Sequence, residues 1–217
     1  MSLLDKIVEI YGKNEPFTLE EVIEKENITE DKKEKFKDEF LDLVKTEQII
    51  MFEWVRILGV NIFYVPKKTK YGNSILSPYK VVNKYFIGCN DNIIGYLGDY
   101  SLLNQLKLTT QVPNVITVIS NVARWPIDEI TLGSQKVRVY KSYVEITNEN
   151  VNVCVFLSAL DAYDTLDDEA KRVLIDYIEE NNIKESDVID CISCYPERVS
   201  KKLIMSGLTK YLKAENI

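Results

Sequence analysis

The residues of this chain that could do chemistry are a pair of closely spaced cysteines and a run of acidic side chains, and histidine is absent from all 217 positions. Cys191-Ile192-Ser193-Cys194 has the spacing of two zinc ligands or of a redox pair. Without histidine or a second such pair, the motif cannot complete a tetrahedral zinc site by itself, so we interpret both cysteines as half-buried structural thiols. The acidic run from Asp161 to Glu169 precedes a predicted helix, where it complements the positive end of the helix dipole.

Other catalytic patterns are missing from the sequence. The lack of histidine removes Ser–His and Cys–His nucleophile pairs, and the chain has neither a P-loop nor a G-x-G-x-x-G motif. Gly133-Ser134 is similar to the start of a nucleotidyltransferase motif, but the Asp-x-Asp that would hold two Mg²⁺ occurs nowhere. We therefore predict a binding or regulatory protein, not an enzyme, with no cofactor and no metal site.

Composition and charge indicate an ordinary folded protein with an uneven distribution of charge. The chain is 46% hydrophobic and 28% charged, and no segment approaches the roughly 20 apolar residues that a membrane span needs. The N-terminus does not have the pattern of a signal peptide, so we expect a cytoplasmic protein. Residues 1–66 carry a net charge of −6, residues 67–143 of +6 and residues 144–217 of −7. The basic middle either exposes a cationic surface or neutralises its own acidic flanks.

The first 66 residues have the element order of a winged helix-turn-helix, which is three helices followed by a β-hairpin. Apolar residues at helical spacing predict a first helix that ends at Gly12. A capping box from Thr18 to Glu21 opens a second helix, and Thr29 caps a third. The inward face of the third helix carries Phe36, Phe40, Leu43 and Val44. Residues 49–65 are rich in β-branched and aromatic side chains and predict the hairpin.

Residues 67–217 predict a second domain of mixed composition, so the expected fold class of the whole chain is α+β. Residues 67–70 are expected to form the linker into this domain. Helices are predicted near residues 81–86, after Gly98, at 168–180 and at 196–213. Strands are predicted at 115–120, 136–140, 143–147 and 151–157, with a hairpin turn at Asn148-Glu149-Asn150 between the last two.

One stretch of the sequence is more specific than these patterns. Phe63-Tyr64-Val65-Pro66 and Tyr71-Gly72-Asn73-Ser74-Ile75-Leu76-Ser77-Pro78 are followed by Gly95-Tyr96-Leu97-Gly98, Leu102-Leu103-Asn104-Gln105-Leu106 and Leu108-Thr109-Thr110-Gln111-Val112-Pro113-Asn114. This order and spacing resembles the antitoxins of type IV, AbiE-like toxin–antitoxin systems (the AbiEi family) and a related family of uncharacterised bacterial proteins. The resemblance covers roughly residues 1–160 in organisation.

The resemblance implies a winged helix-turn-helix over residues 1–66 and an antitoxin-like domain over residues 67–217. In that family the first module represses its own operon by binding operator DNA, and the second counteracts a cognate nucleotidyltransferase-like toxin without necessarily forming a stable complex. We expect most residues of the shared block to have structural roles. Gly95 and Gly98 would serve positive φ angles, and Asn104 and Gln111 would satisfy backbone groups of a loop.

The candidate DNA-binding residues are the cations of the first module and of the segment that follows it. They are Lys32, Lys33, Lys35, Lys37, Arg56, Lys67, Lys68 and Lys70. The remaining candidates for a basic surface are Lys80, Lys84, Arg124, Lys136 and Arg138.

The charge of the third helix argues against DNA binding by that helix. Its expected outward face carries Asp31, Glu34, Asp38 and Asp42 against Lys35 and Lys45, and carboxylates near phosphates reduce affinity. Three interpretations remain open at this point. The helix register differs from the expected one, or a homodimer binds DNA through the basic middle segment, or the winged helix is an interaction module that does not bind DNA.

Overall fold

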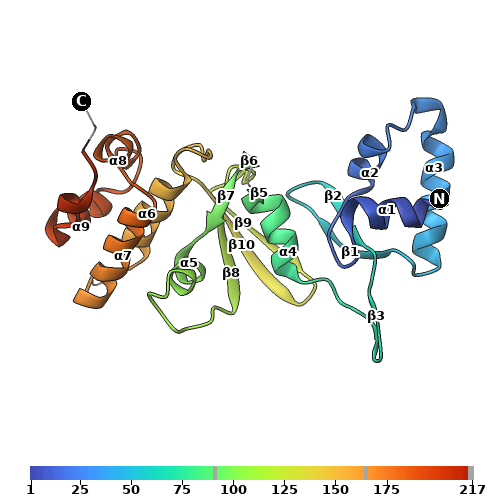
Figure 1. The fold of residues 1–217 in the computed structure, drawn as a ribbon, viewed down its shortest axis with the longest axis horizontal. Helices are drawn as coiled ribbons and strands as arrows, with labels where there is room; N and C mark the ends of the chain where they lie inside the picture. Colours follow the sequence, from blue (N-terminus) through green and yellow to red (C-terminus); the bar gives the residue numbers. More distant parts are fainter. Residues whose placement is uncertain (90–91, 164–165, 215–217) are drawn as a thin grey trace. The chain divides into compact units, whose positions relative to one another are not determined.

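The computed structural model describes residues 1–89, 92–163 and 166–214, and the chain has a mixed α+β fold (Figure 1). It divides into two compact units. The first comprises Met1–Lys84 and Ile130–Ser134, and the second comprises Tyr85–Glu129 and the chain from Gln135 onward. The predicted domain boundary after residue 66 differs from this division. Residues 67–84 pack with the first unit because their side chains bind its loops, as described below.

The second and third N-terminal helices begin where the capping residues predict, and the first begins after Ser2, for which no cap was predicted. Both serine and threonine capping boxes form, since the Ser2 hydroxyl accepts from the Asp5 amide and the Thr18 hydroxyl accepts from the Glu21 amide. Thr29 occupies the N-cap position of the third helix, but its side chain makes no capping hydrogen bond. The helices are α1 (Leu3–Tyr11), α2 (Leu19–Lys25) and α3 (Glu30–Lys45).

The predicted hairpin of the first unit is confirmed as β1 (Ile50–Val55) and β2 (Val60–Tyr64), which pair antiparallel. Phe17 forms a short bridge to Phe63 on the free edge of β2, with backbone hydrogen bonds of 2.8 and 2.9 Å. The core between the helices and the hairpin is aromatic, because Phe40 packs edge-on against Phe63 with ring centroids 5.0 Å apart. The α3 register is the predicted one, with Phe36 and Phe40 buried.

Residues 67–73, whose first four were predicted to be a linker, form a second small hairpin of strands β3 (Lys68–Thr69) and β4 (Gly72–Asn73). The chain then enters α4 (Pro78–Val82), which continues as a π-helical turn over Asn83–Ile87. Val81, Val82 and Phe86 are buried, as the apolar pattern of residues 81–86 predicts.

A four-stranded sheet in the order β7-β8-β10-β9 has most of its residues in the second unit. Strand β8 pairs antiparallel with β7 and parallel with β10. The strands are β7 (Gly95–Leu97), β8 (Val115–Ser120), β9 (Ile127–Leu132) and β10 (Gln135–Lys141). Helix α5 (Asp99–Gln105) connects β7 to β8, and a two-stranded hairpin of β5 (Gly88–Cys89) and β6 (Asn92–Ile93) precedes β7.

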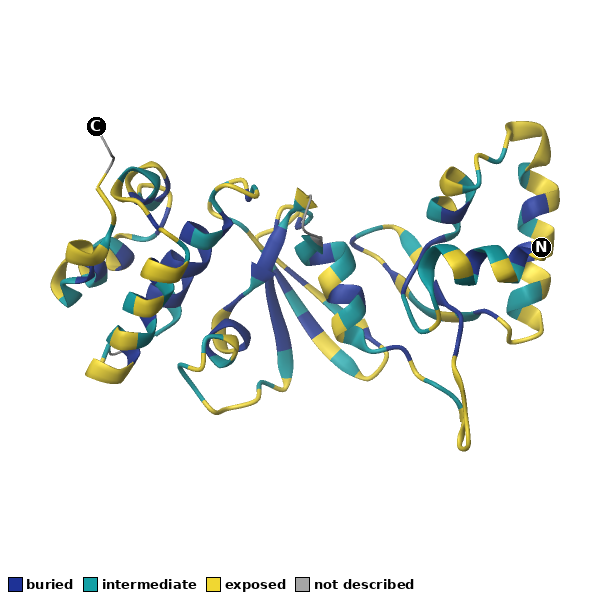
Figure 2. Cartoon of the chain, viewed as in Figure 1, coloured by how far each residue is buried: buried dark blue, intermediate teal, exposed yellow. Residues whose placement is uncertain are grey.

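The predicted strand at residues 151–157 is wrong, because this segment is the start of helix α6 (Val151–Ala162). Nine consecutive or nearly consecutive residues of α6 are buried, so the helix is apolar on every face and its sequence has no helical period (Figure 2). Residues 143–147 lie outside the sheet, and Asn148-Glu149-Asn150 lead into α6 where a hairpin turn was predicted.

The C-terminal helices pack with α6 around one apolar core. Ser158 and Leu160 of α6 are buried, and Leu174 and Val199 reach the same core from later helices. These helices are α7 (Asp168–Glu180), α8 (Glu185–Ile192) and α9 (Glu197–Ser206). Gly207 ends α9 in the left-handed conformation, at φ +75°, where a helix had been predicted to continue to residue 213. None of the described helices has the length and apolarity to span a membrane.

Candidate functional site

The outward face of α3 is acidic, as the sequence predicts. Asp31, Glu34, Asp38 and Asp42 are all exposed. Several lysines of the helix are engaged with these or neighbouring carboxylates. The pairs are Lys33 with Glu30 at 2.5 Å, Lys37 with Glu34 at 4.0 Å and Lys45 with Asp42 at 2.8 Å. Lys32 and Lys35 are exposed and form no ion pair within the described part of the chain, so α3 has little unneutralised positive charge to offer a phosphate.

Lys80 and Lys84 bind the first unit itself. The Lys80 ammonium donates to the Asn14 carbonyl at 2.9 Å and pairs with Glu15. The Lys84 ammonium donates to the Pro16 carbonyl at 2.9 Å and pairs with Glu21 at 2.6 Å. Both side chains are only partly exposed, so they fasten residues 78–84 to the loop between α1 and α2. Their positive charges are therefore largely neutralised by carboxylates of the same unit.

The other basic candidates fall in three places. Lys67, Lys68 and Lys70 lie together on the β3–β4 hairpin and are exposed. Arg56 is exposed in the turn after β1. Arg124, Lys136 and Arg138 belong to the second unit, where Arg138 pairs with Glu129 at 2.8 Å. Lys67, Lys68 and Lys70 therefore form a local cluster of cations with no ion pair among the described residues, and every assignment of a cation to DNA stays a prediction.

The second unit contains a groove beside its sheet. Two cavities of about 480 and 490 Å³ lie on either side of Asp99 and Ala162, which border both. One face of β8 contributes to the groove through Val115, Thr117 and Ile119. The loop that precedes β8 closes one end, and its lining residues are Gln111, Val112, Pro113 and Asn114.

This lining loop belongs to the block that carries the family resemblance, and its shape depends on Asn104. The Asn104 amide donates to the carbonyls of Gln111 at 3.1 Å and Thr109 at 3.4 Å, as predicted for a loop-satisfying amide. Gln111 was predicted to have the same role, but its side chain is exposed at the groove. The loop therefore exposes side chains to the groove, while the Asn104 amide holds its backbone carbonyls.

Gly95 and Gly98 have a different role from the predicted one. Neither glycine has a positive φ. A Cβ on Gly95 would lie 2.1 Å from the Phe86 carbonyl oxygen, and a Cβ on Gly98 would lie 3.0 Å from Ile119. The two glycines permit the close approach of β7 to its neighbours, which places the start of α5 at the groove.

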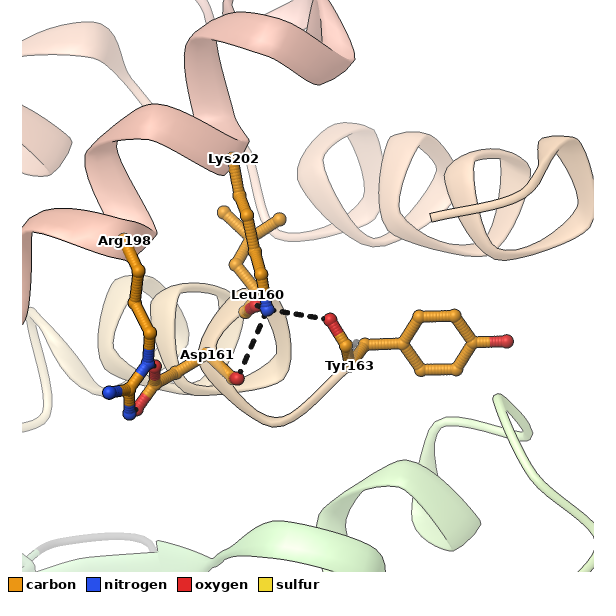
Figure 3. A network of polar contacts seen from close by, with 5 residues as sticks. All are labelled: Leu160, Asp161, Tyr163, Arg198 and Lys202. Carbon is orange, nitrogen blue, oxygen red and sulfur yellow. Dashed lines mark hydrogen bonds and ion pairs between the residues drawn. The ribbon is translucent and has the colours of Figure 1, made fainter. Parts of the chain in front are cut away.

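The electrostatics of the groove centre on Asp99, which the sequence analysis did not single out. It starts α5 with a φ of +43°, an uncommon conformation for a residue with a side chain. Partial removal from water raises the pKa of the Asp99 carboxyl above its usual value, Arg138 opposes this change, and Asp161 adds to it. Asp161 is itself held by Arg198 through hydrogen bonds of 2.5 and 2.9 Å (Figure 3). No sequence signal identifies this cluster, because its members are far apart in the chain.

The chemistry available in the groove is recognition by polar and aromatic groups. Among the described residues no three Cys, Asp or Glu side chains are grouped so that they could hold a metal ion. Cys191 is buried beside Cys154, whereas Cys194 is exposed, so only Cys191 fits the predicted structural thiol. Asp167 caps α7 through the Ala170 amide at 2.8 Å, as expected for the acidic run, while Asp164 lies outside the described residues.

No protein-family model matches this chain, and no curated protein matches it significantly in sequence.

Proposed function

We propose that this protein is a DNA-binding antitoxin of the AbiE-like type, which represses its own operon and counteracts a nucleotidyltransferase-like toxin encoded beside it. The proposal rests on one observation, which is that part of the segment resembling the antitoxin family lines a single groove. Four consecutive residues of that block, Gln111 to Asn114, line the groove, and Gly98 of the same resemblance sets the position of Asp99 there. Residues without catalytic chemistry that together shape a groove are typical of a recognition surface.

The first unit supports the regulatory half of this proposal. Three helices followed by the β1–β2 hairpin, with the Phe17 bridge at the edge of the hairpin, have the order of a winged helix-turn-helix. We place the protein in the cytoplasm, where operator DNA and a toxin would both be encountered, and we keep the homodimer as the form that would match a symmetric operator.

A second candidate function is supported by the charge of α3. A winged helix whose outward face is acidic would serve as an interaction module that binds another protein and not DNA. A mobility-shift assay with the duplex that lies upstream of the reading frame distinguishes the two functions. The proposal expects a shift at low salt, and the interaction module expects none.

Co-expression tests the antitoxin half. We expect this chain to relieve the growth arrest caused by the neighbouring nucleotidyltransferase-like reading frame. Val112→Asp, at an exposed position of the groove, should abolish relief, whereas Ile204→Asp, at an exposed position of α9, should leave it intact. The absence of such a neighbour, or arrest that the wild-type chain does not relieve, would show that the antitoxin assignment is wrong.

A further inference from the structure

The β3–β4 hairpin is a finger that projects from the first unit, and we define the basic finger as residues 67–74. Figure 1 shows it extending away from helices α1–α3, and Figure 2 shows it exposed over nearly its whole length. Lys68 pairs with Asn73 and Thr69 pairs with Gly72, so Lys70 and Tyr71 form a two-residue tip. Gly72 has a φ of +111°, which few other residues would tolerate at this turn.

Hydrogen bonds hold the basic finger in shape at both ends. At the tip, the Thr69 hydroxyl donates to the Gly72 carbonyl at 2.8 Å and accepts from the Tyr71 amide at 3.2 Å. At the base, the Ser74 hydroxyl accepts from the Lys67 amide at 2.9 Å and donates to the Asn14 side chain at 2.8 Å. The Tyr64 hydroxyl also donates to the Ser74 carbonyl at 3.0 Å. The finger is therefore anchored to the body of the unit, which lowers the entropy lost on binding a partner.

The charge of the finger is uncompensated. From Lys67 to Cys89 the sequence contains no aspartate or glutamate. Lys67, Lys68 and Lys70 are exposed, and none of them forms an ion pair within the described residues. This differs from α3, where lysines alternate with carboxylates. A cluster of free ammonium groups on a short ribbon complements a phosphate backbone.

An aromatic ring lies at the end of this cationic ribbon. Tyr71 is 88% exposed, and its ring contacts the Lys70 ammonium at 4.8 Å from the ring centroid. Ile75, just beyond the base, is 82% exposed. Exposing a tyrosine ring at the tip of an ordered hairpin gains nothing for the stability of the fold, whereas such a ring stacks well on a base or fits between base steps.

We propose that the basic finger, and not the outward face of α3, is the principal element that holds duplex DNA. Lys67, Lys68 and Lys70 bind phosphates, and Tyr71 enters a groove of the duplex and contacts the bases. A two-stranded ribbon fits the major groove, which is about 12 Å wide. This inference rests on the DNA-binding half of the proposed function and assigns that function to a segment outside the three helices.

The test measures binding of the full-length protein to the upstream duplex and to a scrambled duplex of equal composition over a range of salt concentrations. The slope of log affinity against log salt is negative, and each phosphate contact contributes about 0.9 to its magnitude. The triple substitution Lys67→Gln, Lys68→Gln, Lys70→Gln should therefore make the slope less steep by about 3. The matched control replaces three exposed lysines of the first unit that are not among the candidate DNA-binding residues, Lys13, Lys25 and Lys45, by glutamine and should leave the slope nearly unchanged.

Tyr71 is tested separately, because an uncharged side chain contributes affinity without contributing to the salt slope. Tyr71→Ala should weaken binding about tenfold at an unchanged slope, and Tyr71→Phe should keep most of the affinity because the ring is retained. The exposed position of Tyr71 means that neither substitution should affect folding, and circular dichroism of each variant checks this.

The outcomes separate this inference from the function on which it rests. A wild-type protein that shifts neither duplex overturns DNA binding and the finger together. A wild-type protein that binds, with a salt slope lowered by the control triple and not by the finger triple, overturns the finger alone. Finger variants that bind DNA normally but fail to relieve toxin arrest would assign the finger to a protein partner and likewise overturn the inference.

Discussion

Lys202 shows how one side chain can determine where a helix ends. Its ammonium donates to the carbonyls of Leu160 at 3.0 Å, Asp161 at 3.3 Å and Tyr163 at 2.8 Å (Figure 3). These are among the carbonyls that the end of α6 leaves without helical partners, and the negative end of a helix dipole favours a cation there. Lys202 therefore acts as a C-terminal cap that is supplied by a different helix, α9.

We expect Lys202→Met to lower the free energy of unfolding by about 2 kcal/mol, because the carbonyls lose a charged donor while the aliphatic part of the side chain is kept. Lys201→Met is the matched control. Lys201 is exposed and, among the described residues, its ion pair is with Glu197 on its own helix, so its loss should cost less than about 0.5 kcal/mol. Urea unfolding followed by circular dichroism measures both, and equal effects of the two substitutions would contradict the capping role.

At the scale of elements, Thr18 and Thr29 occupy the N-cap positions of α2 and α3, but they differ in whether the side chain caps the helix. Thr18 is buried and its hydroxyl accepts from the Glu21 amide at 3.1 Å, while the Glu21 carboxylate accepts from the Thr18 amide at 3.2 Å. Thr29 precedes α3 but makes no such bond. The helix start at Thr18 is thus fixed by its own side chain, whereas α3 depends on the packing of Phe36 and Phe40.

This difference predicts unequal effects of the same substitution. Thr18→Ala should destabilise α2 by about 1 kcal/mol, and Thr29→Ala should change the stability of α3 by only a few tenths of a kcal/mol. Hydrogen exchange of the α2 and α3 amides would show this locally, with faster exchange in α2 of the first variant. Similar changes in both helices would mean that the capping bond of Thr18 contributes little.

Across the whole molecule, there is no histidine, so the pH dependence of the free energy of unfolding comes from other titratable groups. Burial raises the pKa of the Cys154 thiol from 9.0 to about 12, with Cys191 adding to the increase, and burial raises the pKa of Tyr11 to about 12. Each of these groups is neutral in the folded protein at pH values where the unfolded chain would already be ionised.

The sign of the pH dependence follows from proton binding. Above pH 9 the native Cys154 keeps a proton that the unfolded chain releases, so stability is fully present below pH 9 and is lost as the pH rises toward 12, by about 1.4 kcal/mol per unit for this thiol. We therefore expect the free energy of unfolding to decline as the pH rises above about 9.

Two cysteine substitutions provide the check on the alkaline decline. Cys154→Ala should make it shallower, although the variant starts from a lower stability at neutral pH because of the cavity it leaves. Cys194→Ala, at an exposed thiol, should leave the alkaline slope unchanged. Denaturant unfolding at several pH values measures both variants, and an unchanged slope in Cys154→Ala would exclude this thiol as the source.

The sequence by itself determined the features whose causes are local. The capping box at Thr18, the stop at Gly12 and the inward position of Phe36 and Phe40 follow from interactions within one turn or two of a helix, so they can be predicted from neighbouring residues. The acidic outward face of α3 follows from the same periodicity. The α+β class and the α7 helix were predictable for the same reason.

Only the tertiary structure decided the features that depend on distant residues. Val151–Ala162 is a helix because neighbouring elements bury it on all sides, and an apolar run without a period is equally compatible with a buried strand. The sequence shows five lysines in residues 67–84, but only the fold shows that Lys80 and Lys84 are bound to the loop between α1 and α2, while the finger lysines form no ion pair with any described residue. The groove around Asp99 likewise exists only because β8, α5 and α6 meet, since contacts between residues far apart in the chain are set by packing and leave no pattern in the order of residues.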